Sequence, residues 1–242
     1  MIWVYDDQES LSHAAAGLFV QQARQAVQAH GQFSVALSGG HTPRRTYELL
    51  AQPPFRDRVA WTQVHVFWGD ERCVPRDDPR SNECMVREAL LDHVPVPPAQ
   101  IHPILCVQAP REAAEQYEAV LHDFFAGRAP RFDLVFLGLG ENGHTASLFP
   151  NTPVLEERQR WAADVYVAEQ DLYRVTLTAP IINQAAVVAF LVAGVAKAGT
   201  LRAVLEGPSD PHRLPAQLIQ PAQGELQWLV DQKASSLVSR EA

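Results

Sequence analysis

Short apolar runs alternate with segments of helical periodicity along this chain of 242 residues, and that alternation restricts the possible folds more than any other feature. Residues 10–30 place Ala15, Phe19 and Ala23 on one helical face and are followed by Gly31, so they predict an amphipathic helix. The apolar run "FSVAL" (33–37) predicts a strand directly after it. Strands that alternate with helices are typical of a parallel sheet covered by helices.

The same order of elements recurs as far as residue 207. Pro43 suits the first turn of a helix, because the N–H that it lacks would be unpaired there, and it predicts a helix over 43–51. We predict further strands at 64–70, 132–140 and 185–194, and further helices at 81–94, 111–125 and 195–207. Polar and apolar residues alternate between 160 and 180, which predicts a small mixed β region. The expected fold is a Rossmann-like α/β sandwich, a parallel sheet with helices on both faces.

Composition points to one globular domain over residues 1–242, because the chain has no low-complexity linker and no internal repeat. The formal net charge of −8 and the lack of a basic block give no electrostatic footprint for nucleic acid. No segment has the length and hydropathy of a membrane span, and the N-terminus lacks the pattern of a signal peptide. We therefore expect a cytoplasmic protein, monomeric or weakly homo-oligomeric, that binds neither nucleic acid nor membranes.

The three cysteines are unclustered and lack the paired spacing of a zinc site or a redox dithiol. We expect Cys73, Cys84 and Cys106 to be reduced thiols, and we expect no metal.

Four polar turns each follow a predicted strand. They are "SGGHTP" (38–43), "GDER" (69–72), "GENGHTASLFP" (140–150) and "GVAK" (194–197). Right-handed crossovers bring the loops that follow parallel strands to the carboxyl edge of the sheet, where ligands bind in open α/β folds. The four turns are therefore expected to form one site.

The first turn is a candidate phosphate site. Ser38, Gly39, Gly40 and Thr42 precede a helix whose free N–H groups and positive dipole end favour an anion. The alternative is a strand-to-helix turn that uses glycine for steric reasons alone. The Gly-Lys-Ser/Thr signature of a nucleotide P-loop is absent.

The charged residues of the other turns also have two interpretations each. Asp70 and Arg72 are candidate ligand-binding residues, since arginine binds phosphate or carboxylate in a bidentate manner, but the charges of "GDER" could instead pair with one another on the surface. Lys197 opposes the dipole in the first turn of its predicted helix, which suggests a role with a ligand, and a solvated lysine is the alternative.

Three further polar residues are weaker candidates for the same site. Ser81 and Asn82 begin a predicted helix, and ordinary N-capping is the alternative. Arg174 could equally be a charge on the surface of a strand.

His144 is the candidate catalytic residue. Gly143 before it, also a candidate substrate-binding residue, can adopt a positive φ and turn the imidazole into the crevice. The nearby sequence holds no second histidine or cysteine cluster at metal-ligand spacing, so acid–base chemistry is the favoured role.

Taken together, the segments "LSGGHTP", "FWGDERCVPRDDPRSN", "LGLGENGHTASLFP" and "VTLTAPIINQAAVVAFLVAGVAK" resemble the successive motifs of the 6-phosphogluconolactonase family. The likeness extends in order over nearly the whole chain. It implies hydrolysis of 6-phospho-D-glucono-1,5-lactone to 6-phosphogluconate in the pentose phosphate pathway, without metal or organic cofactor. It also implies that His144 activates water, and that Gly39, Gly40, Arg72 and Lys197 bind the anionic substrate.

One departure from the family pattern concerns the residue before the Gly-His pair. Members commonly have Asp there, whereas this chain has Asn142, preceded by Glu141. An asparagine can orient neighbouring groups and bind substrate, but it adds no negative charge beside His144.

Three other functions compete with lactone hydrolysis. Glucosamine-6-phosphate deaminases resemble this family, but their two carboxylates around the histidine correspond to Asn142 and Phe149 here. A non-catalytic sugar-phosphate sensor would need an added DNA-binding segment or a lost histidine. Action on other sugar lactones, phosphorylated or not, stays open.

Overall fold

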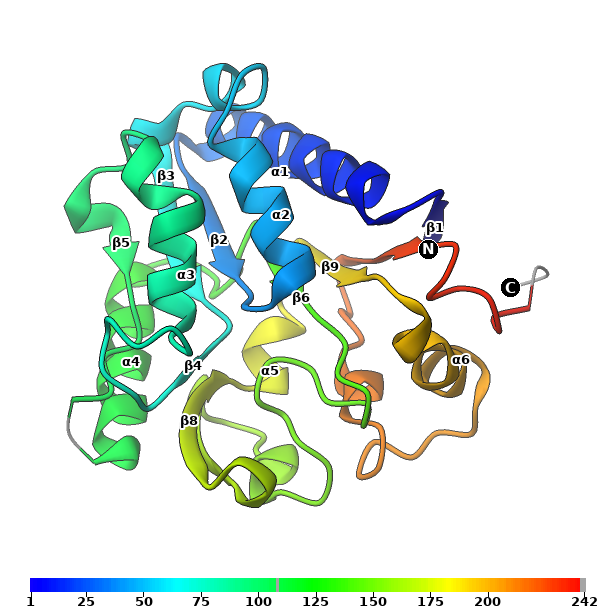
Figure 1. Cartoon of the computed structure of the whole chain (residues 1–242). Coiled ribbons are helices and arrows are strands. Elements are labelled where there is room, and N and C mark those ends of the chain that lie inside the picture. Colours follow the sequence, from blue (N-terminus) through cyan, green and yellow to red (C-terminus); the bar gives the residue numbers. More distant parts are fainter. Residues whose placement is uncertain (108, 240–242) are drawn as a thin grey trace.

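Seven strands form a fully parallel central sheet, with β1 at one end and β5 at the other (Figure 1). The computed structural model describes residues 1–107 and 109–239. The strand order is β1-β10-β9-β6-β2-β3-β5. The bounds of these strands are β1 Ile2–Tyr5, β2 Phe33–Leu37, β3 Val64–Trp68, β5 Ile101–His102, β6 Leu134–Leu137, β9 Val187–Val192 and β10 Glu225–Asp231. The predicted α/β architecture is confirmed.

A second, antiparallel sheet lies beyond the carboxyl ends of the central strands. It contains β4 (Asp70–Arg72), β8 (Leu172–Leu177) and β7 (Ala162–Val167), in the order β4-β8-β7. The predicted mixed β region is therefore correct, although the sequence did not indicate its third strand, β4. The backbone N–H of Leu177 donates to the carbonyl of Gly69 at 2.8 Å, which joins the two sheets.

Six α-helices among the described residues accompany the sheets. Their bounds are α1 Gln8–His30, α2 His41–Leu50, α3 Asn82–Ala89, α4 Pro110–Phe124, α5 Ala179–Ile182 and α6 Ala198–Glu206. The Asp7 side chain caps α1 by accepting from the N–H of Ser10 at 2.8 Å, and Gly31 ends the helix at φ 83°. Helix α1 packs against α2 and α2 against α3, whereas α4 packs against the small sheet.

Several predicted elements are shorter in the structure. The strand predicted at 64–70 ends at Trp68, because the chain turns at Gly69 and enters the small sheet. The helix predicted at 81–94 ends at Ala89, and the apolar strands keep only 134–137 and 187–192. The helix predicted at 195–207 begins as a 3-10 turn at Val195–Lys197. Apolar composition thus located these buried segments but did not show which of their residues form the hydrogen bonds between strands.

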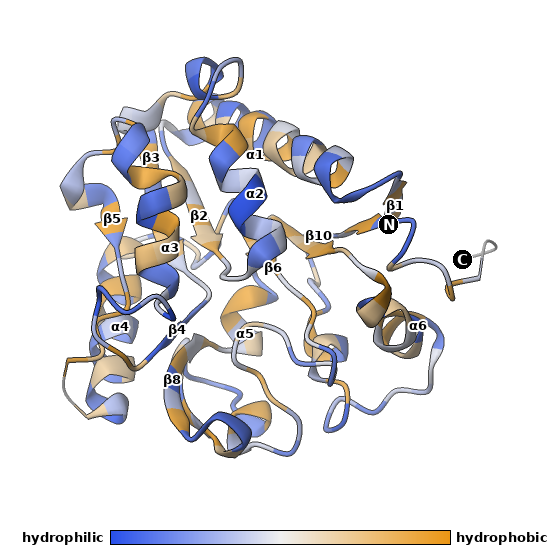
Figure 2. Ribbon diagram, viewed as in Figure 1, coloured by the Kyte–Doolittle hydropathy of each residue, from blue (hydrophilic) through white to orange (hydrophobic). Residues whose placement is uncertain are grey.

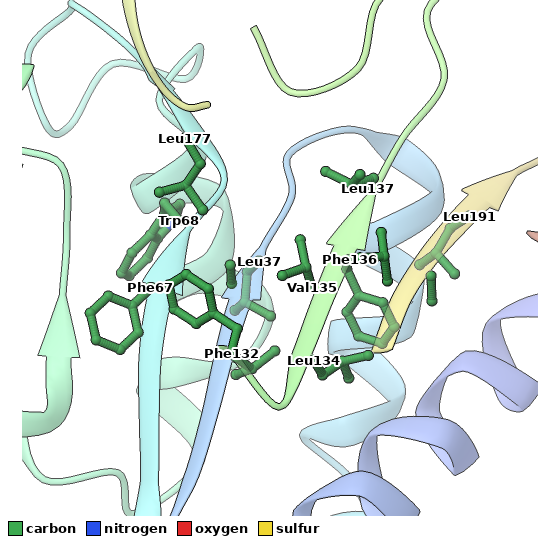
Figure 3. Packing of buried hydrophobic residues seen from close by; sticks show 14 of the residues in the cluster. Leu37, Phe67, Trp68, Phe132, Leu134, Val135, Phe136, Leu137, Leu177 and Leu191 are labelled. Atoms are coloured by element: carbon green, nitrogen blue, oxygen red, sulfur yellow. The ribbon is translucent and has the colours of Figure 1, made fainter. Parts of the chain in front are cut away.

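The core is continuous through both sheets. All residues of β2, β6 and β9 are buried, and the strands appear as hydrophobic ribbons between helices with mixed faces (Figure 2). Figure 3 shows Phe67, Phe132 and Phe136 packed around the central strands. This packing fixes the strand ends from which the polar turns emerge.

The prediction that the cysteines are reduced is wrong for two of them. Cys73 and Cys106 form a disulfide, with their Cα atoms 5.0 Å apart, and Cys84 is free. Cys73 follows β4 and Cys106 follows β5, so their proximity comes from the pairing of β3 with β5. A separation of 33 residues leaves no local spacing motif from which the pairing could be read.

Among the residues that the structure describes, no helix combines the length and hydropathy that crossing a membrane requires.

Candidate functional site

The four predicted turns meet at one cavity of about 380 Å³ at the carboxyl edge of the central sheet. It is lined by Ser38, Gly39, Gly40, Thr42, Asp70, Arg72, Asn82, His144, Arg174 and Lys197, among others. The prediction that segments distant in the sequence form one site at this edge agrees with their position in the fold.

The glycine turn connects β2 to α2. Gly40 has φ 104°, and no side chain caps the first turn of α2, so its N–H groups stay available to a ligand. A Cβ atom on Gly39 would lie 1.9 Å from Oδ1 of Asn82, so only glycine fits beneath α3. Tyr47 holds the strand end, because its hydroxyl donates to the carbonyl of Ser38 at 2.9 Å and accepts from the Ser38 N–H at 3.0 Å. The backbone of this turn is thus fixed from two sides.

A buried ion pair lies on another wall of the cavity. Asp70 Oδ2 accepts from the hydroxyl of Ser147 at 2.6 Å and lies 3.3 Å from Nη1 of Arg174. Asp70 and Arg174 are each only 5% exposed. The alternatives of charges that pair within "GDER", or of Arg174 on a strand surface, are therefore wrong, because β4 pairs with β8 and buries both residues against the His144 loop.

Glu71 and Ser81 have a structural role at the start of α3. Glu71 accepts from the N–H groups of Asn82 and Glu83 at 2.7 Å each, and from the hydroxyl of Ser81 at 2.9 Å. Burial raises the pKa of the Glu71 carboxyl. Ser81 also accepts from the N–H of Cys84 and does not line the cavity, so the capping alternative applies to it. Asn82 does line the cavity, and its Nδ2 donates to the carbonyl of Asp70 at 2.9 Å.

Two cations border the cavity with incomplete pairing. Arg72 donates through Nη1 to the carbonyl of Arg80, while its buried Nε has no partner among the described residues. Lys197 lies just before α6 instead of within its first turn, and its Nζ is 3.8 Å from a carboxylate oxygen of Glu141. Glu141 is exposed, so this ion pair is weak, and both cations are available to an anion in the cavity.

The imidazole of His144 is held by its own loop. Gly143 has φ 82° and packs against Leu214, away from the cavity. The Nδ1 atom of His144 lies 2.5 Å from Oδ1 of Asn142. Since that oxygen can only accept, Nδ1 carries the hydrogen and Nε2 is left as the basic nitrogen. Asn142 itself is exposed and does not line the cavity, so it contacts the histidine and not the cavity.

Burial lowers the pKa of His144 to about 4. The carboxylate of Asp70 opposes this effect, whereas Arg174, Lys197 and Arg72 add to it. The imidazole is therefore neutral at pH 7, which is the form that accepts a proton.

The sequence did not single out several residues that line the cavity. Gln8, His41, Gly138 and Ala146 reach it, and the ring of Phe149 stacks on His144 nearby. His41 stands inside the "SGGHTP" turn, so its position was readable, but Gln8 comes from the start of α1 and has no motif. No group of three or more His, Cys, Asp or Glu side chains within 1–107 and 109–239 is placed to hold a metal ion.

A neutral imidazole with one free nitrogen, in the same cavity as a glycine turn and two cations, is the arrangement of an acid–base enzyme for a small anionic substrate. The sequence model of glucosamine-6-phosphate isomerases/6-phosphogluconolactonase matches residues 6–228, and the chain belongs to this family.

Comparisons with individual proteins point to the second of these two activities. The chain is 48% identical to a 6-phosphogluconolactonase of Synechocystis over 214 residues, 86% of each chain. It is 41% identical to the 6-phosphogluconolactonase of Nostoc, covering 98% of this chain and 97% of the relative. The solved 6-phosphogluconolactonase of Trypanosoma cruzi superposes with a TM-score of 0.86 at 26% identity, over 98% and 96% of the two chains. A monomeric glucosamine-6-phosphate deaminase, at 21% identity and a TM-score of 0.84, shares the fold.

Proposed function

We propose that this chain hydrolyses 6-phospho-D-glucono-1,5-lactone to 6-phosphogluconate, in the oxidative branch of the pentose phosphate pathway. The observation that carries the proposal is the free Nε2 of a neutral His144 in the cavity that also contains the glycine turn. A ring lactone is an activated ester, so one general base and stabilisation of an oxyanion suffice for its hydrolysis. The residues present require no covalent nucleophile.

The base acts on water. Nε2 of His144 removes a proton as the water oxygen attacks C1 of the lactone, and the imidazolium returns that proton to the departing ring oxygen. Because Nδ1 keeps its bond to Asn142 throughout, the same nitrogen serves in both steps. With a pKa of about 4, His144 is a weak base but is unprotonated at neutral pH. The imidazolium that forms is a correspondingly strong acid toward the leaving oxygen.

The other end of the substrate is bound remotely from the reacting carbonyl. We assign the phosphate to the N–H groups after Ser38, Gly39 and Gly40 and to Thr42, with Arg72 and Lys197 as counter-charges. Asp70, Asn82 and Arg174 border the space where the sugar hydroxyls would lie. Binding the unreactive end holds C1 within reach of the base, which lowers the entropic part of the barrier.

Deaminase activity is not favoured. The two carboxylate positions that flank the histidine in deaminases are Asn142 and Phe149 here, so the groups that open a sugar ring are missing. Ammonia release from glucosamine 6-phosphate is expected to stay at background, and turnover of that sugar would reverse this assignment.

The test of the proposal is lactone loss on freshly made 6-phosphogluconolactone, corrected for spontaneous hydrolysis. His144→Ala is expected to lower kcat by about 10²–10⁴-fold while product binding changes little. His13→Ala, on the outer surface of α1, is the matched control. Near-normal turnover by His144→Ala would remove the histidine from the mechanism.

Several coarser expectations belong to the same proposal. We infer that residues 1–242 work as one domain, without cofactor, as a monomer or weak homo-oligomer in the cytoplasm. The continuity of β1 with β10 in one sheet supports the single domain. The Cys73–Cys106 disulfide is the observation that argues against a cytoplasmic location, because cytosolic thiols are ordinarily reduced. Cell fractionation locates the protein, and trapping of free thiols before lysis shows whether Cys73 and Cys106 are oxidised in the cell.

A further inference from the structure

Phe149 is a buried aromatic residue at the margin of the hydrophobic core. It is 4% exposed, yet it lies outside the continuous core cluster that contains its neighbour Leu148. Its ring stacks on the imidazole of His144, with centroids 4.1 Å apart and planes at 18°. The guanidinium carbon of Arg174 lies over the same ring, 5.2 Å from its centroid. The ring thus packs on ionisable groups of the cavity.

Two other contacts bear on the orientation of the imidazole. One is the hydrogen bond from Nδ1 to the exposed Asn142. Another is the backbone of Gly140, where a Cβ atom would lie 2.0 Å from Nδ1 and 2.2 Å from Cε1. A single hydrogen bond at one ring nitrogen leaves the ring able to swing about that contact. A flat aromatic surface against the ring removes this freedom.

We propose that Phe149 is a positioning residue for the lactone hydrolysis described above: its ring fixes the plane of His144 and so directs Nε2 at the substrate carbonyl. The proposal rests on the assignment of His144 as the base. Phe149 itself does not touch the reacting atoms. Its contribution is the orientation of the base, to which rates are sensitive at the level of an ångström.

The ring of Phe149 also covers one face of the imidazole. The charged groups that act on His144 come from separate elements: Asp70 and Arg72 from β4, Arg174 from β8 and Lys197 from the turn before α6. Glu141 in the same loop faces Lys197 at 3.8 Å. Because none of these charges is removed by an apolar replacement of Phe149, a change in the titration of His144 reports on exposure of its ring.

The experiment compares Phe149→Leu with Phe149→Tyr. Leucine keeps the apolar character but lacks a flat ring to stack on His144, whereas tyrosine keeps that ring. Phe149→Leu is expected to lower kcat about tenfold or more with KM changed less than about threefold, and Phe149→Tyr to retain most of the parent rate. Titration of the His144 imidazole by NMR, without substrate, is expected to move toward higher pH in Phe149→Leu and to stay in place in Phe149→Tyr. Phe149→Met provides a second non-aromatic variant if Phe149→Leu fails to fold.

Two results would overturn the proposal. One is a parent-like rate and titration in the leucine or methionine variant. The other is an equal loss of kcat in the leucine and tyrosine variants with an unchanged imidazole titration, the pattern of a general loss of packing. If the parent protein does not hydrolyse the lactone, the proposed function fails, while the NMR titration still tests the contact between Phe149 and His144.

Discussion

The two halves of the cavity are built differently. On the side of the base, side chains bond to one another: His144 bonds to Asn142, Ser147 bonds to Asp70, and Arg174 pairs with the same carboxylate, although Nε of Arg174 has no partner among the described residues. On the side of the glycine turn, α2 begins without a side-chain cap and Nε of Arg72 has no partner in the described part of the chain. In the proposed mechanism the base is thus oriented before the substrate arrives, whereas the side proposed to bind the anion is completed by the substrate.

The largest effect is expected from breaking the base side at its buried ion pair. Asp70→Ala leaves the charge of Arg174 buried without a partner, and should lower the free energy of unfolding by about 3–5 kcal/mol. Chemical denaturation measures this loss. The double variant Asp70→Ala/Arg174→Met removes both charges and should be less destabilised than the single variant. As a control, Glu115→Ala breaks an exposed pair with Arg111 and should cost at most about 1 kcal/mol. If Asp70→Ala and Glu115→Ala lower the free energy of unfolding equally, the side chains around the base are not held by a buried ion pair.

The next effect concerns the support of the anion-binding side. The disulfide of Cys73 ties the strand that carries Arg72 to the loop after β5. Cys73→Ser is expected to lower the free energy of unfolding by about 2–4 kcal/mol, because the unfolded chain regains the freedom of a closed loop. The loss should raise KM more than it lowers kcat. Cys84→Ser, which removes the free thiol, is the matched control. If a reductant leaves the melting temperature of the parent unchanged, the disulfide does not stabilise the protein.

Gly39 tests the fit of the anion-binding side directly. Gly39→Ala pushes a methyl group into Asn82 and should reduce kcat/KM about 10²-fold, equivalent to about 2.7 kcal/mol, mainly through KM. Gly17→Ala, where a Cβ atom meets nothing within 4 Å, is the control and should be neutral. Adding Asn82→Ala removes the clash, so the double variant should recover part of the loss. A parent-like KM for Gly39→Ala would show that the turn does not bind substrate.

The smallest effect is the dependence of activity on pH. With a pKa of about 4, His144 stays unprotonated from pH 7 to pH 6, so kcat/KM should be flat there and fall only near pH 4. An ordinary histidine would lose about threefold over the same interval. The unfolded state takes up its proton near pH 6.5, so the folded state loses stability as pH falls from there toward 4. A kcat/KM profile with its midpoint near 6.5 would mean that the cavity does not desolvate the base.

The sequence predicted that the four turns come together, for a topological reason. Each of the four turns follows a parallel strand, so the rule for carboxyl edges brought Gly39, Arg72, His144 and Lys197 together without knowledge of any contact. The fold class followed from the alternation of strands and helices along the sequence. Strand β10 was missed because "ELQWLVD" mixes polar and apolar residues, and because no helix was predicted directly before it.

Other features depend on contacts across long separations in the sequence. The disulfide joins two loops that meet only because β3 pairs with β5. Burial of Arg174 depends on the pairing of β8 with β4, about 100 residues away. Ser81 could not be assigned to capping or to binding until the position of Glu71 was known. Local patterns carry no information on any of these partners.

The place of β1 in the sheet has a consequence for the synthesis of the chain. Its only neighbour among the described strands is β10, and the paired residues, such as Val4 and Val230, are separated by most of the sequence. During translation β1 is therefore made well before its partner, and it cannot pair until the ribosome has added the segments up to and including β10. Until then the backbone N–H and C=O groups of "IWVY" have no partner strand, and they bond to water instead.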